Sequence, residues 1–430
     1  MDNYHMNREK DIRPCTVSVA SETGRLRAVM LRRPGEEIER MTPLNAAHAL
    51  YSDILDKRAV DREYDYFCGV LDRWTQVYYV KDILAKLLED ETRKERLVRE
   101  SLRHDTLLRS RNAFIPYDNS VIQQLMDLDA EALSQVLIEG YENPQWDGRS
   151  EDRYLLNPLY NLLFTRDAAA TLYNRVLINS MSFDVRQRES LIDEVIFRDF
   201  FGVETLNAQQ WDSWARTEGG DILMASKELM CVGQGARTNP RGLDFLVQTA
   251  ARERRHFHIL VQELPLKPES FIHLDMVFTF LGEHHCMVFE PMLTKQGLFE
   301  GKDTTLITID DGRVSYRQVK NILEGLRLLG WEMEPVLCGG NDPWVQLREQ
   351  WHSGANFFAL GDDKVMGYRR NPYTIEALDH AGFAVIDAED IIVGKTRMSD
   401  YERFVVAFPG AELPRAGGGA RCMTMPIWRE

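Results

Sequence analysis

The chain has 430 residues, of which 44% are hydrophobic and 28% charged, a composition typical of a globular protein with a large core. This composition excludes an intrinsically disordered chain, a collagen-like repeat and a small disulfide-stapled scaffold. The 67 Asp and Glu residues outnumber the 52 Lys and Arg residues, and the net charge of −15 disfavours binding to nucleic acid or to an anionic membrane.

The sequence contains no membrane-crossing stretch of about 18 apolar residues. Its first residues, MDNYHMNREKDIRP, lack the apolar core of a signal peptide, so we expect a cytoplasmic protein. The cysteines are scattered without a CxxC pair, which argues against a disulfide framework and against a zinc site. We expect most of them to be buried thiols. They are Cys15, Cys68, Cys231, Cys286, Cys338 and Cys422.

Short apolar runs bounded by turn residues alternate with amphipathic stretches, a pattern that predicts an α/β fold. The predicted strands are residues 26–31, 76–80, 176–179, 222–224, 229–232, 257–261, 276–281, 286–289, 357–360 and 383–386. Helical periodicity covers residues 243–254, 316–329 and 374–380.

One segment departs from this alternation. Residues 83–140 contain no strand candidate and carry leucine stripes at helical spacing. The polar, turn-rich stretch 143–153 follows and is interpreted as a return linker. We therefore expect a helical subdomain, residues 83–150, inserted into an α/β body formed by residues 1–82 and 151–430.

Two motifs combine carboxylates with groups that can transfer protons or approach a ligand. In Phe-Ile-His-Leu-Asp (271–275), strand alternation would place His273 and Asp275 on one face. In Thr-Glu-Gly-Gly-Asp (217–221), paired glycines are flanked by Glu218 and Asp221 ahead of a predicted hairpin. A strand end with solvated polar residues and an ordinary loop turn are the alternative interpretations.

Two further motifs complete the set. In Asn-Leu-Leu-Phe-Thr-Arg-Asp (161–167), an apolar run is bracketed by Asn161 and Asp167, and a capping role is the ordinary explanation for Asp167. In the glycine-rich stretch 417–426, Cys422 follows an arginine, and a neighbouring cation favours a nucleophilic thiolate. The spacing is not that of a phosphate-binding loop.

Together these motifs supply a thiol, an imidazole and three carboxylates without a metal or phosphate motif. This set suits covalent attack on a positively charged carbon, because carboxylates can bind the N–H groups of a guanidinium in bidentate fashion. We therefore expect neither a cofactor nor a metal ion.

The ordered motifs resemble those of arginine deiminases, members of the guanidino-group modifying, or pentein, superfamily. The resemblance extends over nearly the whole chain. The matching motifs are SETGRLRAVMLRRPGEEIERMTP (21–43), NLLFTRD (161–167), INSM and VRQRES (178–190), EGGD (218–221), VGQGART (232–238), HLDMVFT (273–279), LREQW and YRRN (347–371) and ARCMTMPI (420–427).

The resemblance implies a role for each catalytic candidate. Cys422 would attack the guanidinium carbon and form a covalent amidino-thioether. His273 would protonate the departing ammonia and then activate water, with Glu218 orienting it. Asp167 and Asp275 would hold the guanidinium nitrogens.

The resemblance also implies the substrate. Asn161, Arg186 and Arg237 match the groups that bind an α-carboxylate, so free L-arginine would be hydrolysed to L-citrulline and ammonia. The protein would be a hydrolase acting on C–N bonds in linear amidines. An amidinotransferase, which passes the amidino group to an amine, and a non-catalytic arginine-binding relative are the alternatives.

The fold implied is a five-bladed α/β propeller with an inserted helical subdomain, and we expect a homo-oligomer. Two departures from the family pattern stand out. Gly417 occupies a position where many members have arginine or methionine, and Arg415 is a candidate replacement. Residues 391–410 form an apparent insertion before the nucleophile, interpreted as a lid, an oligomer contact or a plain surface loop.

Overall fold

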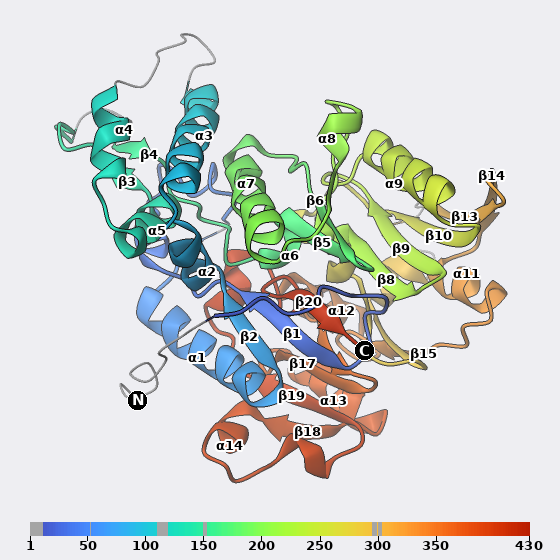
Figure 1. The fold of residues 1–430 in the computed structure, drawn as a ribbon. Helices are drawn as coiled ribbons and strands as arrows, with labels where there is room; N and C mark the ends of the chain where they lie inside the picture. The colour runs from blue at the N-terminus through green and yellow to red at the C-terminus, as the bar shows by residue number, and fades with distance from the viewer. Residues whose placement is uncertain (1–11, 52, 110–118, 149–152, 295–298, 300–302) are drawn as a thin grey trace.

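The computed structural model describes residues 12–51, 53–109, 119–148, 153–294, 299 and 303–430, which form a mixed α/β structure with several sheets (Figure 1). The two ends of the chain meet in one of these sheets. There β1 (Leu26–Leu31) pairs antiparallel with β20 (Met425–Arg429) and parallel with β2 (Gln76–Tyr79). The loop that carries Cys422 therefore enters a strand beside the N-terminal one.

Four other sheets of three or more strands follow, each beginning with an antiparallel hairpin. A later strand then pairs parallel with the second hairpin strand, which requires a crossover connection. The four sheets contain β5 (Ala169–Leu172), β6 (Arg175–Ile178) and β7 (Thr205–Asn207); β8 (Ile222–Ser226), β9 (Leu229–Gln234), β10 (His256–Glu263), β13 (Thr304–Asp310) and β14 (Arg313–Val319); β11 (Phe278–Phe280), β12 (His285–Val288) and β15 (Glu334–Leu337); and β16 (Phe358–Gly361), β17 (Lys364–Tyr368), β18 (Ala384–Asp387) and β19 (Phe404–Phe408).

Helices connect and cover these sheets (Figure 1). Several begin at the side-chain caps that their sequences provide: Asp56 accepts from the backbone N–H of Arg58, and Asn239 from that of Gly242. The helices are α1 (Lys57–Trp74), α2 (Val80–Leu87), α3 (Glu91–Arg109), α4 (Asn119–Met126), α5 (Ala130–Glu139), α6 (Thr165–Ala168), α7 (Gln187–Val195), α8 (Ala208–Trp211), α9 (Pro240–Glu253), α10 (Glu290–Leu293), α11 (Ile322–Leu328), α12 (Pro343–Trp351), α13 (Pro372–His380) and α14 (Ala388–Ile392).

The predicted strands are confirmed within a few residues, with one consequential exception. The predicted strand at 276–281 is confirmed only for Phe278–Phe280, because Leu274–Met276 forms a 3₁₀ turn. His273 and Asp275 are therefore not on a strand, and the argument from strand alternation is wrong. A turn, whose backbone direction changes within three residues, sets their side-chain directions instead.

A second prediction also needs correction. Residues 316–329 were expected to form one helix, but residues 313–319 belong to β14 and only Ile322–Leu328 is helical. Asp311 and Gly312, both at positive φ, make the tight turn that pairs β14 with β13. Residues 313–319 therefore pair with β13 as a strand. The helix begins only after Asn321, whose side chain caps it.

Helices α2 to α5 cover most of the described part of residues 83–140, where helices without strands were expected, and residues 110–118 lie outside the described residues. The leucines of these helices, including Leu84, Leu97 and Leu133, share one hydrophobic cluster with Ile178 and Ile427 of the sheets. Two strands, β3 (Tyr141–Glu142) and β4 (Tyr154–Leu156), follow α5. Of the expected return linker, residues 149–152 lie outside the described residues.

Residues 404–408 are not part of a lid. They form β19, which lies between β17 and β18 in the middle of a sheet, and all five residues are buried. The apolar run Phe404–Phe408 is core because both faces of this strand are covered. The interpretation of residues 391–410 as a lid, an oligomer contact or a surface loop is therefore wrong for this strand.

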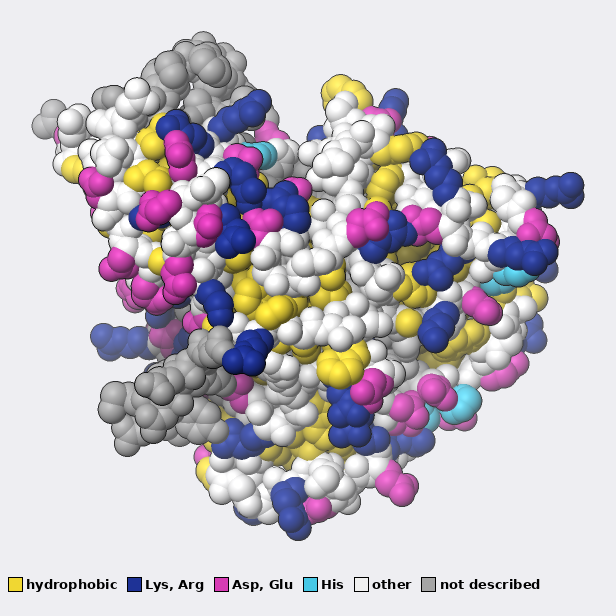
Figure 2. All heavy atoms as spheres, in the orientation of Figure 1, with side chains coloured by type: hydrophobic (Ala, Val, Ile, Leu, Met, Phe, Trp, Pro, Cys, Tyr) yellow, Lys and Arg dark blue, Asp and Glu magenta, His cyan; other side chains and the backbone are white. Residues whose placement is uncertain are grey.

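The surface carries charges of both signs. On the face in Figure 2, Lys and Arg side chains are interspersed with Asp and Glu side chains over much of the area. None of the described helices combines the length and the apolar character needed to cross a bilayer.

Candidate active site

The predicted catalytic residues lie in turns or short helices that come shortly before a strand. Asp167 belongs to α6, ahead of β5, and Glu218 comes before the turn that leads into β8. His273 and Asp275 lie before β11, and Cys422 lies before β20. All five are buried, and the contacts below bring them together from four different sheets.

His273 is held against the glycine turn. Its Nε2 lies 2.9 Å from Oε2 of Glu218, and its Nδ1 lies 3.7 Å from Oδ1 of Asp167. A Cβ at Gly220 would lie 2.5 Å from this Nδ1, so glycine is required for the imidazole to pack here. The paired glycines of the sequence motif therefore admit the histidine ring.

The charges around His273 favour its protonated form. Burial alone would lower the pKa of His273, but Asp167 and the hydrogen bond with Glu218 raise it to about 9. Burial would raise the pKa of Glu218, but Arg237 and His273 hold it well below its ordinary value. At neutral pH the pair is therefore an imidazolium and a carboxylate, and His273 can donate a proton.

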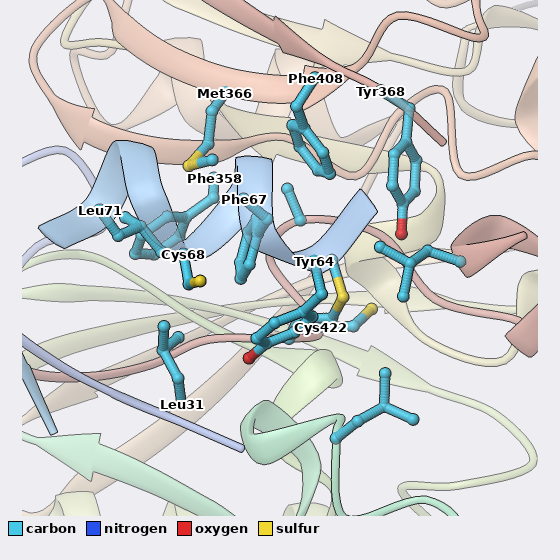
Figure 3. Close-up of a cluster of buried hydrophobic side chains, with 14 of the residues drawn as sticks. Leu31, Tyr64, Phe67, Cys68, Leu71, Phe358, Met366, Tyr368, Phe408 and Cys422 are labelled. Carbon is cyan, nitrogen blue, oxygen red and sulfur yellow. The ribbon is translucent and has the colours of Figure 1, made fainter. Parts of the chain in front are cut away.

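The thiol of Cys422 lies at the edge of a hydrophobic cluster that includes Tyr64 and Phe408 (Figure 3). Its Sγ is 3.8 Å from Oδ2 of Asp275. Burial, and then the charges of Asp275 and Asp167, raise the pKa of the thiol well above its ordinary value. Arg421 lowers this pKa, as the sequence suggested, but burial outweighs it.

Arg421, whose side chain the sequence analysis gave no structural role, anchors one of the carboxylates. It donates to Asp275 at 2.8 Å and to Glu22 at 2.9 and 3.0 Å, and it is almost completely buried. Burial would raise the pKa of Glu22, but Arg421 and Arg166 lower it to about 2. This ionic network fixes Asp275 beneath the thiol.

Three buried polar atoms around the thiol have no hydrogen-bond partner among the described residues. They are Oδ1 of Asp167, Oδ1 of Asp275 and Nδ1 of His273. Buried polar atoms are normally paired, so two unpaired carboxylate oxygens mark a place for N–H donors. A planar cation with several N–H groups, such as a guanidinium, suits these acceptors.

The predicted carboxylate-binding residues also lie here, each already engaged. Arg186 donates to Asp167 at 2.7 Å and to Glu189 at 2.8 Å, and Arg237 donates to Glu218 at 3.2 Å. Asn161 donates to the carbonyl of Ala49 at 2.7 Å. Sequence reasoning missed Glu189, although its spacing of three residues from Arg186 on a helical segment was a usable signal.

Asp167, Glu218 and His273 place one ligand atom each within 4.8 Å of one another, a geometry that a metal ion could use. However, Arg186 and Arg237 already neutralise the two carboxylates, and the pKa of about 9 makes His273 a cation at neutral pH. The arrangement fits proton transfer better than metal binding.

The first departure from the family pattern concerns Gly417 and Arg415, which come shortly before Cys422 in the chain. Gly417 adopts a φ of 95° with open space where a Cβ would be. Arg415 pairs with Asp53 and Glu412 and is about one-third exposed. In this structure its guanidinium is therefore held by these two acids and pairs with none of the catalytic carboxylates.

A model of the arginine deiminase family matches residues 48–429. An arginine deiminase of Listeria monocytogenes serotype 4b (strain CLIP80459) is 28% identical over 96% of this chain and 98% of its own length. An arginine deiminase of Listeria welshimeri serovar 6b is 29% identical with the same coverage.

Solved structures share the mixed α/β fold. The product-bound N-terminal domain of ArgZ, an arginine dihydrolase of the cyanobacterial ornithine-ammonia cycle, superposes with a TM-score of 0.52 at 13% identity, covering 94% of this chain and 97% of that domain. SxtG, an amidinotransferase of saxitoxin biosynthesis from Microseira wollei, gives a TM-score of 0.50 at 15% identity, covering 97% and 98%. At these identities the similarity is one of fold.

Proposed function

Because the chain belongs to the arginine deiminase family, we propose that it hydrolyses free L-arginine to L-citrulline and ammonia. One observation carries the assignment of the site. Buried, unpaired oxygens of Asp167 and Asp275 flank the thiol of Cys422, beside the protonated imidazole of His273. These groups supply the acceptors, the nucleophile and the acid that the reaction needs.

Binding of the substrate prepares the nucleophile. The guanidinium N–H groups donate to Asp167 and Asp275, and the positive charge offsets the two carboxylates that raise the pKa of Cys422. With the cation bound, the thiol of Cys422 releases its proton to solvent and becomes a thiolate. Its sulfur attacks the guanidinium carbon and forms a C–S bond.

His273 acts first as the general acid and then as the general base. Its imidazolium gives a proton to the amino group, the C–N bond breaks and ammonia leaves, so that an amidino-thioether remains on Cys422. Neutral His273 then takes a proton from water while the water oxygen attacks the same carbon. The C–S bond breaks and the thiolate returns, while the new hydroxyl group gives its proton through solvent to the released ammonia, so that citrulline and ammonium leave. The sum is arginine cation plus water giving citrulline plus ammonium.

The far end of the substrate carries a carboxylate, and we assign its binding to Arg186 and Arg237, with Asn161 beside them. Both guanidinium groups are buried and charged, and each reaches a catalytic carboxylate. An amino acid carboxylate brings the bidentate acceptor that such groups bind. A guanidino compound without that carboxylate would bind weakly.

We further propose that the five larger sheets are the blades of an α/β propeller formed by residues 1–82 and 151–430, with residues 83–150 inserted. Supporting this, four of the sheets begin with a hairpin and extend by a parallel strand, and the first sheet joins both chain ends. We also propose a cytoplasmic homo-oligomer, and light scattering after size exclusion measures its mass.

The function is tested by incubating the protein with L-arginine alone and measuring citrulline and ammonia in equal amounts. Cys422→Ser should abolish both products, since a hydroxyl is a far weaker nucleophile, and circular dichroism should show an unchanged fold. Cys15→Ser, half-buried and outside the site, is the matched control and should remain active. Ornithine formed only with an added amine acceptor would establish an amidinotransferase instead.

A further inference from the structure

The side chain of Asn356 forms hydrogen bonds both with Cys422 and with the turn that carries Asp275. Its Nδ2 donates to Sγ of Cys422 at 3.2 Å and to the carbonyl of Asp275 at 3.1 Å. Its Oδ1 accepts from the backbone N–H groups of Arg421 at 2.9 Å and of Cys422 at 3.2 Å. The side chain is 1% exposed, so no water competes for these bonds.

The position of Asn356 in the fold repeats that of the catalytic residues. It lies just before β16, the first hairpin strand of its sheet. Asp167, Glu218 and Asp275 likewise come before the first strands of three other sheets, and Cys422 comes before β20 of the remaining one. Asn356 is thus the residue that the sheet beginning with β16 contributes to the same centre, although the sequence analysis did not select it.

We propose that Asn356 acts on the nucleophile directly, by holding Sγ of Cys422 toward the bound guanidinium and donating Nδ2–H to the sulfur whenever it is a thiolate. This proposal deepens the proposed function and rests on it. The bond is available twice in the cycle: before the sulfur attacks, and when the C–S bond breaks and returns the electron pair to sulfur.

The electrostatic setting explains why a neutral donor is useful here. Asp275 and Asp167 face the sulfur and oppose its negative charge, Arg421 favours it, and the Tyr368 hydroxyl nearby donates to the carbonyl of Gly418. An amide donates a hydrogen bond without carrying a charge that would repel the substrate cation. It also cannot take the thiol proton, so it leaves acid and base chemistry to His273.

The test separates the donor from the shape of the side chain. Asn356→Asp keeps the acceptor for the two backbone N–H groups but replaces the donor with a carboxylate oxygen. Asn356→Leu has similar volume, adds no charge and removes the donor. If the leucine variant fails to fold, Asn356→Ala, which is uncharged and has no side-chain donor, takes its place. Thermal unfolding checks that each variant is native.

The readout is the rate of alkylation of Cys422 by chloroacetamidine as a function of pH, followed by intact mass. The thiolate displaces chloride and forms a thioether, and Cys422→Ser gives the unlabelled baseline. We expect the alkylation profile of both variants to move to higher pH by about one to two units, the worth of a hydrogen bond to a charged group. For the same reason kcat with arginine should fall roughly 10- to 100-fold, with a smaller change in KM.

Asn371→Leu is the matched control, because Asn371 is equally buried and donates to the carbonyl of His352 rather than to the sulfur. Its alkylation profile should match wild type. If the uncharged variant at position 356 folds and its alkylation rate depends on pH as in the wild type, the proposal is overturned. Any shift of the profile in Asn356→Asp would then be due to the added charge alone. A failure to produce citrulline would overturn the proposed function. The alkylation test could still be interpreted in that case, because alkylation of Cys422 does not require turnover.

Discussion

The guanidinium of Arg186 donates to the carboxylate of Asp167 at 2.7 Å, so the chain's own arginine engages a group that we assign to the substrate's guanidinium. Glu189 holds the other side of Arg186 at 2.8 and 3.0 Å. When arginine binds, its guanidinium can replace Arg186 on Asp167 and its carboxylate can take the released donor. The two ends of the substrate are thereby linked through one side chain.

This arrangement predicts how substrate selectivity depends on Arg237. Arg237→Ala should lower kcat/KM for L-arginine, because the substrate carboxylate loses its partner and with it a few kcal/mol of binding free energy. The loss for agmatine, which has no carboxylate, should be much smaller. Steady-state kinetics with both compounds measures the ratio. Exposed Arg397→Ala, outside the site, is the control, and an unchanged preference for arginine in Arg237→Ala would rule out the carboxylate assignment.

The raised pKa of His273 predicts a pH-dependent stability. A histidine whose folded pKa exceeds its ordinary value of 6.5 stabilises the fold fully below that pH and loses this contribution as pH rises through about 9. Relative to His273→Gln, the wild type should lose about 3 kcal/mol of unfolding free energy over that window. Urea unfolding at a series of pH values measures it. Exposed His380→Gln should follow the wild type, and parallel curves for His273→Gln would contradict the raised pKa.

The three consecutive glycines before the nucleophile should differ in tolerance. A Cβ at Gly419 would lie 2.5 Å from Oδ1 of Asn356, whereas Gly417 has open space and only a positive φ. Gly419→Ala should therefore displace the Asn356 contacts and remove most activity. Gly417→Ala should retain activity and cost roughly 1–2 kcal/mol of strain. Equal activity of the two variants, measured as citrulline formation, would show that the contact with Asn356 is dispensable.

The ion pair between Glu22 and Arg421 predicts a loss of folding stability when Glu22, which we give no role in the reaction, is replaced. Glu22→Gln removes the charge that faces a fully buried guanidinium, and breaking such a pair costs about 3–5 kcal/mol. Denaturant unfolding at neutral pH measures the loss. Exposed Glu332→Gln should change stability by less than about 0.5 kcal/mol. A comparable small change in Glu22→Gln would mean that Asp275 alone satisfies Arg421.

Local pattern was sufficient for most strands and for the helices α2 to α5, because alternation and helical periodicity act over neighbouring residues. It failed where a turn competed with the pattern. The run before Phe278 is apolar enough for a strand, but Leu274–Met276 forms a 3₁₀ turn that lets Asp221 accept from the N–H of Leu274. Likewise, the pairing of β13 with β14 replaced the first four residues, 316–319, of a predicted helix.

The sequence by itself determined the kinds of groups in the site: one thiol among six, a histidine and the carboxylates of ordered motifs. Only the tertiary structure decided their relations, because these groups come from short segments before four different strands and no local pattern encodes contacts across sheets. It paired Arg186 with Asp167 and Glu189, placed Arg421 between Asp275 and Glu22, and brought Asn356 to the sulfur of Cys422. Burial then set the charge states, since removing these groups from water makes each pKa depend on partners far away in the chain.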